Sequence, residues 1–192
     1  MICIAGIFIA ELHKSNTLSR LMLSAFLFSW IGDILLMSDA SLFFILGLSA
    51  FLIAHIIYII AFTKSLRQKK NTLLKQKFYL ALSFYLVAAI IFVILQPHLL
   101  NLMIPVLFYT LILTTMVVSA LNLYGQIPKK AWLLILAGAF LFMISDTSLA
   151  FNKFYSPLPF SNLIIMSTYV AAQYLIMKGT LTWLNENTKN SM

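Results

Sequence analysis

Residues 42–63 read LFFILGLSAFLIAHIIYIIAFT, an apolar run without a single Asp, Glu, Lys or Arg. An α-helix rises about 1.5 Å per residue, so this run is long enough to cross the roughly 30 Å hydrocarbon core of a bilayer. Similar apolar runs recur along the chain, separated by short stretches rich in Asn, Pro, Lys and Gly, such as residues 125–130. The pattern predicts a chain that crosses a membrane several times.

The composition of the 192-residue chain leads to the same conclusion. Hydrophobic residues make up 62% of the chain and charged residues only 9%. Soluble domains are about 25% charged and less than half apolar, so a water-soluble globular fold is excluded. The loops are too short to hold a separate soluble domain. We therefore expect one transmembrane domain over residues 1–192, folded as an all-α, polytopic helical bundle.

Seven apolar segments are expected to form the helices of this bundle. The first, residues 1–12, would rise only about 18 Å, which is too short to cross the hydrocarbon core. It also lacks the basic region and the cleavage site of a signal peptide, so we expect the chain to begin inside a helix. The other segments lie at 18–38, 42–63, 78–96, 99–122, 131–151 and 161–184.

The basic residues predict how the bundle is oriented. All of the 13 Lys and Arg residues except Lys153 fall on one side, formed by residues 13–20, 64–77, 123–130 and the C-terminus. The positive-inside rule makes this basic side cytoplasmic, so we expect a multi-pass protein of a bacterial inner membrane with a cytoplasmic C-terminus. The loop 64–77 could alternatively bind RNA or anionic lipid, but its position favours the topological role, and we expect no nucleic-acid partner.

Two pairs of segments resemble each other. Residues 28–33 (FSWIGD) and 141–146 (LFMISD) each end in Ile, a small residue and Asp. In the segments that follow, 51–55 (FLIAH) and 169–173 (YVAAQ) each place an aromatic residue four positions before His or Gln. The order and shared direction predict a parallel repeat of four helices about an axis along the membrane normal. A complete pair of repeats would have eight helices, one more than the segments seen.

The residues most suited to chemistry are Asp33 and Asp146, which both lie inside apolar segments. Each is about five residues from the end that faces away from the basic side, or roughly 7 Å below the surface. A carboxyl group inside a membrane is costly and is a functional candidate by default. Burial and a like neighbour both disfavour ionisation, so one of the two could be a proton donor and the other could activate water. Alternatively, Ser29 and Ser145 could bind these carboxyl groups in a purely structural arrangement.

Other polar side chains extend this candidate site. His55 and, one turn later, Tyr58 lie deeper in their segment, and Tyr169 and Gln173 hold the matching place in the other half of the predicted repeat. We expect these four residues and Ser29 to line a substrate cavity. The alternative for His55 is a packed, hydrogen-bonded core residue.

Lys153 is the only Lys or Arg on the side opposite the basic one, two turns beyond Asp146. There it could hold a phosphate at the membrane interface, or it could simply extend toward the headgroups. The three histidines lack the spacing of metal ligands, and the chain has no nucleophile elbow, P-loop or dinucleotide fingerprint. We therefore expect neither a metal ion nor a cofactor.

Four stretches together resemble the YhhN-like lysoplasmalogenase family. They are GDILL at 32–36, AHIIY at 54–58, SDTSLA at 145–150 followed by Lys153-Phe154, and YVAAQ at 169–173. The resemblance covers nearly the whole chain and implies an eight-helix membrane hydrolase that needs no metal. Such enzymes cleave the vinyl ether bond of lysoplasmenyl-ethanolamine or lysoplasmenyl-choline to a fatty aldehyde and glycerophosphoethanolamine or glycerophosphocholine.

The resemblance also bears on individual residues. By motif match, Asp33 and Asp146 correspond to the intramembrane aspartates of the family, and the implied partners are a lysophospholipid substrate and the lipid bilayer. Family members carry a further N-terminal helix, and often a Lys-Pro that opens the helix corresponding to residues 1–12. Both are missing here, so we expect the chain to be N-terminally truncated relative to the family.

The strongest alternative function is a proton-coupled transporter of a small molecule or lipid that uses the same two carboxyl groups. Transporter cores usually interrupt helices near the midplane with Gly or Pro. Here Asp33 and Asp146 lie near one face, and Pro105 is at a segment end. A scaffold without a ligand would explain neither aspartate. The sequence therefore favours an enzyme.

Overall fold

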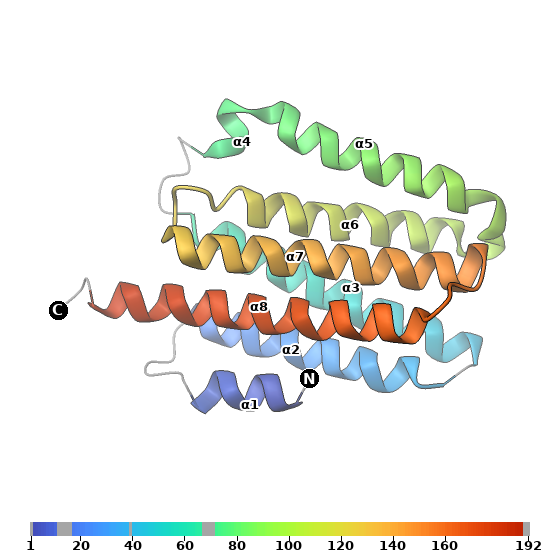
Figure 1. Cartoon of the computed structure of the whole chain (residues 1–192), viewed down its shortest axis with the longest axis horizontal. Helices are drawn as coiled ribbons and strands as arrows, with labels where there is room; N and C mark the ends of the chain where they lie inside the picture. The colour runs from blue at the N-terminus through green and yellow to red at the C-terminus, as the bar shows by residue number, and fades with distance from the viewer. Residues whose placement is uncertain (1, 11–16, 39, 67–71, 190–192) are drawn as a thin grey trace.

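All regular structure in the described part of the chain is helical (Figure 1). The computed structural model describes residues 2–10, 17–38, 40–66 and 72–189. The α-helices are α1 (Ile2–Ala10), α2 (Thr17–Leu36), α3 (Ser41–Lys64), α4 (Leu73–Gln76), α5 (Phe78–Leu95), α6 (Met103–Leu121), α7 (Lys129–Ala150) and α8 (Ser161–Lys189). Two 3₁₀ turns, Gln96–His98 and Leu100–Leu102, connect α5 to α6, and a π-helical turn, Phe151–Tyr155, extends α7.

The predicted all-α membrane bundle is confirmed, and each of the seven predicted segments corresponds to a helix. Five helical stretches are long and apolar enough to cross a membrane: Thr17–Leu36, Ser41–Lys64, Phe78–His98, Leu100–Leu121 and Lys129–Tyr155. The first helix, α1, is only nine residues long, and α8 is a 29-residue helix with a more polar second half. The short helix α4 was not among the predicted segments.

The outer surface of the bundle is apolar, as contact with lipid requires. Large side chains such as Leu82, Val93, Ile104 and Leu163 are more than half exposed. In water such a surface would favour aggregation, whereas the hydrocarbon core of a bilayer solvates it without cost. The chain is therefore a multi-pass membrane protein.

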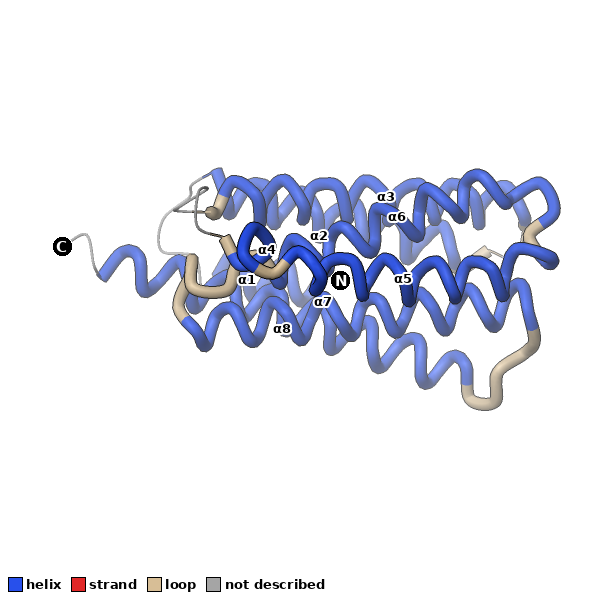
Figure 2. The backbone as a smooth tube through the Cα atoms, turned by 90° about the horizontal axis from the view of Figure 1, so that it is seen from above, coloured by secondary structure: helices blue, strands red, loops and turns tan. Residues whose placement is uncertain are grey.

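The helices run roughly along one long axis, and their connections lie at the two ends (Figures 1 and 2). One end, which we call the basic end, holds the start of α7 with Lys129 and Lys130 and the end of α3 with Lys64. The other end holds the turns between α5 and α6 and between α7 and α8 (Figure 1). We call it the site end, because both intramembrane aspartates lie on the last turns of α2 and α7 there.

Two antiparallel helix pairs, α2 with α3 and α7 with α8, make the most extensive contacts, and α6 joins them. Glycines let α7 and α8 approach closely. A Cβ atom on Gly138 would lie 2.7 Å from the backbone oxygen of Ala172, and one on Gly179 would lie 2.9 Å from that of Ala131. Small residues are the usual means of close helix packing in membranes. The two pairs occupy the positions that the proposed repeat assigns to them, but the repeat itself stays a prediction.

Helix α5 lies on the outside of the bundle and packs chiefly against α6 (Figure 1). Within α5 only Ala88 and Leu95 are buried. The main core instead fills the space between α2, α3, α6, α7 and α8. The largest fully buried side chains from these helices include Phe26, Tyr58, Met116 and Phe142.

Candidate functional site

Asp146 lies on the last turn of α7, with a side chain that is 11% exposed. The hydroxyl of Tyr109, on α6, donates a hydrogen bond of 2.5 Å to its Oδ2 atom. The Nε2 atom of His55, on α3, lies 3.8 Å from the same oxygen. Three helices thus converge on Oδ2, and Oδ1 is the oxygen that neither Tyr109 nor His55 engages.

His55 is fully buried among aromatic rings. Its ring meets Phe142 edge-on at 4.6 Å between centroids and Tyr109 at 5.5 Å. Neither ring nitrogen has a hydrogen-bond partner among the described residues. His55 is therefore packed in the core, as the alternative for this residue predicted, but it lacks the hydrogen bond of that alternative. Its ring also lies next to Asp146.

Asp33 lies on α2 and is partly buried. It faces Tyr169 on α8, whose hydroxyl is close enough to interact electrostatically with both Asp33 and Asp146. That hydroxyl is buried and has no hydrogen bond of normal geometry to any described residue. Tyr169 therefore connects the surroundings of the two aspartates, and Asp33 is the carboxyl group that it approaches as a hydrogen-bond partner.

The two aspartates face a common cavity of about 200 Å³ at the site end, between α2, α7 and α8. We call it the polar cavity, because a carboxyl pair, a phenol, a hydroxyl and two amides contribute to its wall. Its lining residues that carry polar side chains are Asp33, Ser145, Asp146, Asn152, Asn162 and Tyr169.

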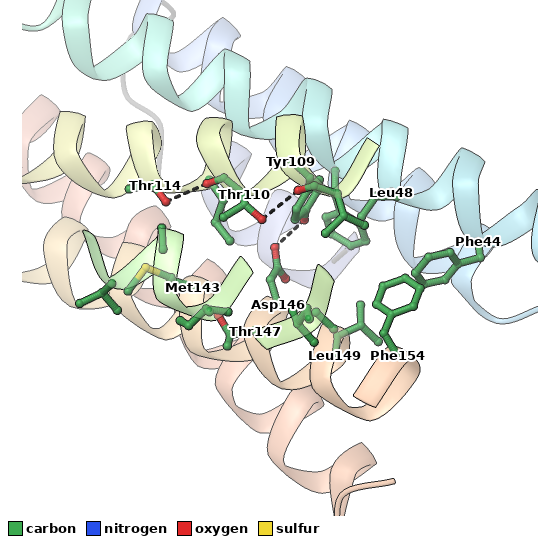
Figure 3. Close-up of a pocket in the computed structure, with 18 of the residues that line it drawn as sticks. Phe44, Leu48, Tyr109, Thr110, Thr114, Met143, Asp146, Thr147, Leu149 and Phe154 are labelled. Carbon is green, nitrogen blue, oxygen red and sulfur yellow. Dashed lines mark hydrogen bonds between the residues drawn. The ribbon is translucent and has the colours of Figure 1, made fainter. Parts of the chain in front are cut away.

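A second, apolar cavity of about 60 Å³ lies between α3, α5, α6 and α7 (Figure 3). Its wall consists mainly of aliphatic and aromatic side chains, among them Phe44, Leu48 and Ala88. Asp146 belongs to the wall of this apolar cavity as well as to that of the polar cavity, whereas Asp33 belongs only to the polar one. Asp146 therefore stands at the junction of two chemically different spaces.

Three of the predicted site residues form a buried hydrogen-bond network instead of a cavity wall. The Tyr58 hydroxyl donates to Gln173 Oε1 at 2.7 Å, and Gln173 Nε2 donates to Ser29 Oγ at 3.1 Å. All three side chains are fully buried. The network joins α3, α8 and α2, and so fixes the helices that carry Asp33 and Tyr169.

The structural alternative for the aspartates predicted hydrogen bonds from neighbouring serines, and the structure pairs these serines differently. Ser29 binds Gln173, and the Ser145 hydroxyl donates to the backbone oxygen of Ile165 at 3.0 Å. The hydrogen-bond partner of Asp146 is Tyr109, which the sequence analysis missed. The available signal was weak: Tyr109 is near the site end of its segment, but sequence alone does not pair that segment with α7.

Lys153 lies on the π-helical turn and is exposed. Its Nζ atom lies 5.1 Å from the centre of the Phe44 ring, a cation–π contact. Phe44 and Phe154, whose rings meet edge-on at 5.7 Å, line the apolar cavity. The lysine therefore lies beside the wall of the apolar cavity at the site end, and it directly follows Asn152, which lines the polar cavity.

No three His, Cys, Asp or Glu side chains in the described ranges come together as metal ligands would. The expectation that the protein works without a metal ion stays a prediction.

Comparisons with known proteins extend these observations. Residues 1–180 match the YhhN family. The chain is 35% identical over 181 residues to Lysoplasmalogenase TMEM86B of Homo sapiens, an alignment that covers 94% of this chain and 72% of the human protein. It is 33% identical over 175 residues to Lysoplasmalogenase TMEM86B of Rattus norvegicus, covering 91% of this chain and 67% of the rat protein. No solved structure matches the chain.

Proposed function

The chain belongs to the YhhN family, and on this basis we propose that it is a membrane hydrolase that cleaves the vinyl ether bond of lysoplasmalogens. The substrates would be lysoplasmenyl-ethanolamine or lysoplasmenyl-choline. The products would be a fatty aldehyde and glycerophosphoethanolamine or glycerophosphocholine. The relatives named lysoplasmalogenases support a hydrolase of this kind.

The position of Asp146 is the observation that carries the proposal beyond the relatives' names. A lysoplasmalogen consists of one hydrocarbon chain, a vinyl ether and a polar glycerophosphate part, in that order. It needs an apolar space for the chain and a polar space for the glycerol, with the reacting bond between them. Asp146 stands where the apolar and the polar cavity meet.

The two carboxyl groups suit the reaction. Vinyl ether hydrolysis needs a proton on an alkenyl carbon, and then a water molecule that adds to the resulting oxocarbenium ion. The hemiacetal so formed breaks down to an aldehyde and an alcohol. Two carboxyl groups that face one cavity, Asp33 and Asp146, can act as the proton donor and the water activator. This chemistry requires no metal or cofactor.

The other predicted site residues take supporting roles in this proposal. Lys153 would hold the phosphate of the headgroup, since it is exposed at the site end and directly follows Asn152, which lines the polar cavity. Tyr58, Gln173 and Ser29 would keep the helices around the polar cavity in place through their buried network. His55 would act on Asp146 and not on the substrate, because it is fully buried.

The orientation that we propose follows from the charges. Since Lys64, Lys129 and Lys130 lie at the basic end, that end and the C-terminus would face the cytoplasm of a bacterial inner membrane. The cavities would then open toward the opposite leaflet. A reporter enzyme fused to the C-terminus, active only in the cytoplasm, tests this orientation.

The decisive experiment is the detection of fatty aldehyde by mass spectrometry after adding lysoplasmenyl-ethanolamine. Membranes that contain the protein, its Asp146→Asn variant or an empty vector are compared at equal total protein. We expect aldehyde above the empty-vector level from the unmodified protein alone. Equal aldehyde in all three membranes would refute the proposal, and proton-driven uptake of the lipid into proteoliposomes would then favour the transporter.

A further inference from the structure

The two aspartates differ in the cavities that they line, and these cavities differ in the polarity of their walls. Asp146 lines both cavities, whereas Asp33 lines only the polar cavity. Figure 3 shows the Asp146 carboxyl group among the aliphatic and aromatic side chains of the apolar cavity, directed toward Tyr109. Asp33 instead shares its surroundings with the amides of Asn152 and Asn162.

The vinyl ether also has two different ends. The proton must add to the alkenyl carbon that bears the hydrocarbon chain, because only then is the positive charge shared with the ether oxygen. The water must add to the other carbon, which is bonded to that oxygen. A proton donor is therefore required on the chain side of the double bond, and a water molecule on the glycerol side.

We propose that Asp146 is the proton donor and that Asp33, together with the Tyr169 hydroxyl, holds and activates the water. This assignment rests on the function proposed above. With the first carbons of the hydrocarbon chain in the apolar cavity, the chain-side carbon of the double bond comes to the Asp146 carboxyl group. The carbon bonded to oxygen then faces the polar cavity, where Asp33 and Tyr169 lie.

The hydrogen bonds of Asp146 agree with the role of a donor. Tyr109 donates to Oδ2, and His55 Nε2 lies near the same atom. A protonated carboxyl group has one donor oxygen and one oxygen that accepts, so Tyr109 directs the acidic proton to Oδ1. Tyr109 is thus a positioning residue, which acts on the substrate only through Asp146.

The Tyr169 hydroxyl marks the place of the water. It is buried and lies close enough to Asp33 to interact with that carboxyl group, but it makes no hydrogen bond of normal geometry to a described residue. Buried polar groups in proteins are almost always bonded to protein or to ordered water. The hydroxyl lines the polar cavity, whose volume of about 200 Å³ leaves room for several molecules of water. A water molecule shared between Tyr169 and Asp33 would satisfy both groups.

Asp33 and Asp146 account for every proton transfer in the reaction. Asp146 gives its proton to the chain-side carbon, the π electrons form the new C–H bond, and an oxocarbenium ion remains. Water bonds to the carbon next to the ether oxygen while Asp33 removes one of its protons, which yields the hemiacetal. Asp33 then returns that proton to the departing glycerol oxygen, and the hemiacetal hydroxyl proton passes to Asp146. The aldehyde is released and both carboxyl groups regain their starting states.

Rescue by azide distinguishes the two roles, because azide adds to an oxocarbenium ion without losing a proton. The matched variants are Asp33→Ala and Asp146→Ala, each with space for a small anion. Each substitution is expected to lower aldehyde formation about 100-fold or more, the usual contribution of a positioned acid or base. Sodium azide should then accelerate substrate consumption by both variants to different extents, with a factor for Asp33→Ala that is at least about tenfold larger than the factor for Asp146→Ala. The product should have the mass of the lysoplasmalogen plus hydrazoic acid.

Equal rescue of both variants, no rescue of either, or greater rescue of Asp146→Ala would overturn the assignment. If either alanine variant fails to fold, as judged by its gel-filtration profile in detergent, the same comparison is made with Asp33→Asn and Asp146→Asn. Failure of the proposed function is recognised separately, since the unmodified protein would then release no aldehyde.

Discussion

Replacing Tyr109 with Phe tests how Asp146 is held. The substitution removes one hydroxyl from a nearly buried ring and with it the hydrogen bond to Asp146 Oδ2. A hydrogen bond between neutral groups contributes about 0.5–1.5 kcal/mol, and one to a charged group about 1.5–3 kcal/mol. As Asp146 passes from acid to carboxylate during proton donation, the bond from Tyr109 therefore strengthens by about 1–1.5 kcal/mol.

Only an interaction that is stronger in the transition state affects the chemical step. The Tyr109→Phe variant should thus show a kcat for aldehyde release about five- to tenfold lower, with KM nearly unchanged. Release of aldehyde from lysoplasmenyl-ethanolamine is followed in detergent over a range of substrate concentrations.

Tyr85 offers a matched control, because its hydroxyl bonds to Thr115 Oγ1 at 2.8 Å between α5 and α6, and neither of these residues lines either cavity. The Tyr85→Phe variant should keep the kcat of the unmodified protein. The reasoning fails if Tyr109→Phe also keeps its kcat, if its loss appears only in KM, or if both variants lose kcat equally.

Three other substitutions test the cavity, the buried network and the interface lysine. Ala88→Leu should lower kcat/KM about 5- to 150-fold for substrates whose chain reaches this residue, since overpacking costs about 1–3 kcal/mol, while shorter chains are unaffected. The control is Ala89→Leu, whose side chain faces outward on the same helix; a uniform loss at all chain lengths would refute the role of the cavity. Gln173→Leu leaves two buried hydroxyl groups without their partner, so the midpoint of thermal unfolding in detergent should fall by about 2–12 °C; an unchanged midpoint would show that the network is not stabilising. Lys153→Ala should raise KM about two- to fivefold, as loss of an exposed ionic contact implies, and Lys153→Arg should restore it; equal KM values in all three proteins would remove the phosphate contact from the proposal.

The helices could be predicted from the sequence because each one corresponds to a local pattern, an apolar run between polar residues. The same holds for the position of Asp33 and Asp146 near the ends of α2 and α7, which follows from counting residues along a helix. The match in boundaries is close: the segment predicted at 42–63 corresponds to α3, Ser41–Lys64.

The contacts of Asp146 could not be predicted, because they depend on which helices become neighbours. An apolar surface in lipid gains little from one partner over another, so hydropathy does not specify that α6 lies beside α7. Tyr109 and the apolar cavity both arise from that neighbourhood. The contact of Lys153 on the π-helical turn with Phe44 likewise joins two helices far apart in the sequence, so it has no local sequence pattern.

The outer position of α5 has a consequence for how a lipid reaches the site. A helix that packs chiefly against one neighbour separates from the others at a low cost in free energy. Since α5 forms one wall of the apolar cavity, its movement would open a lateral gate between the bilayer and Asp146. A lysolipid would then enter laterally from its leaflet without exposing its hydrocarbon chain to water. The aldehyde would return to the bilayer through the same gate.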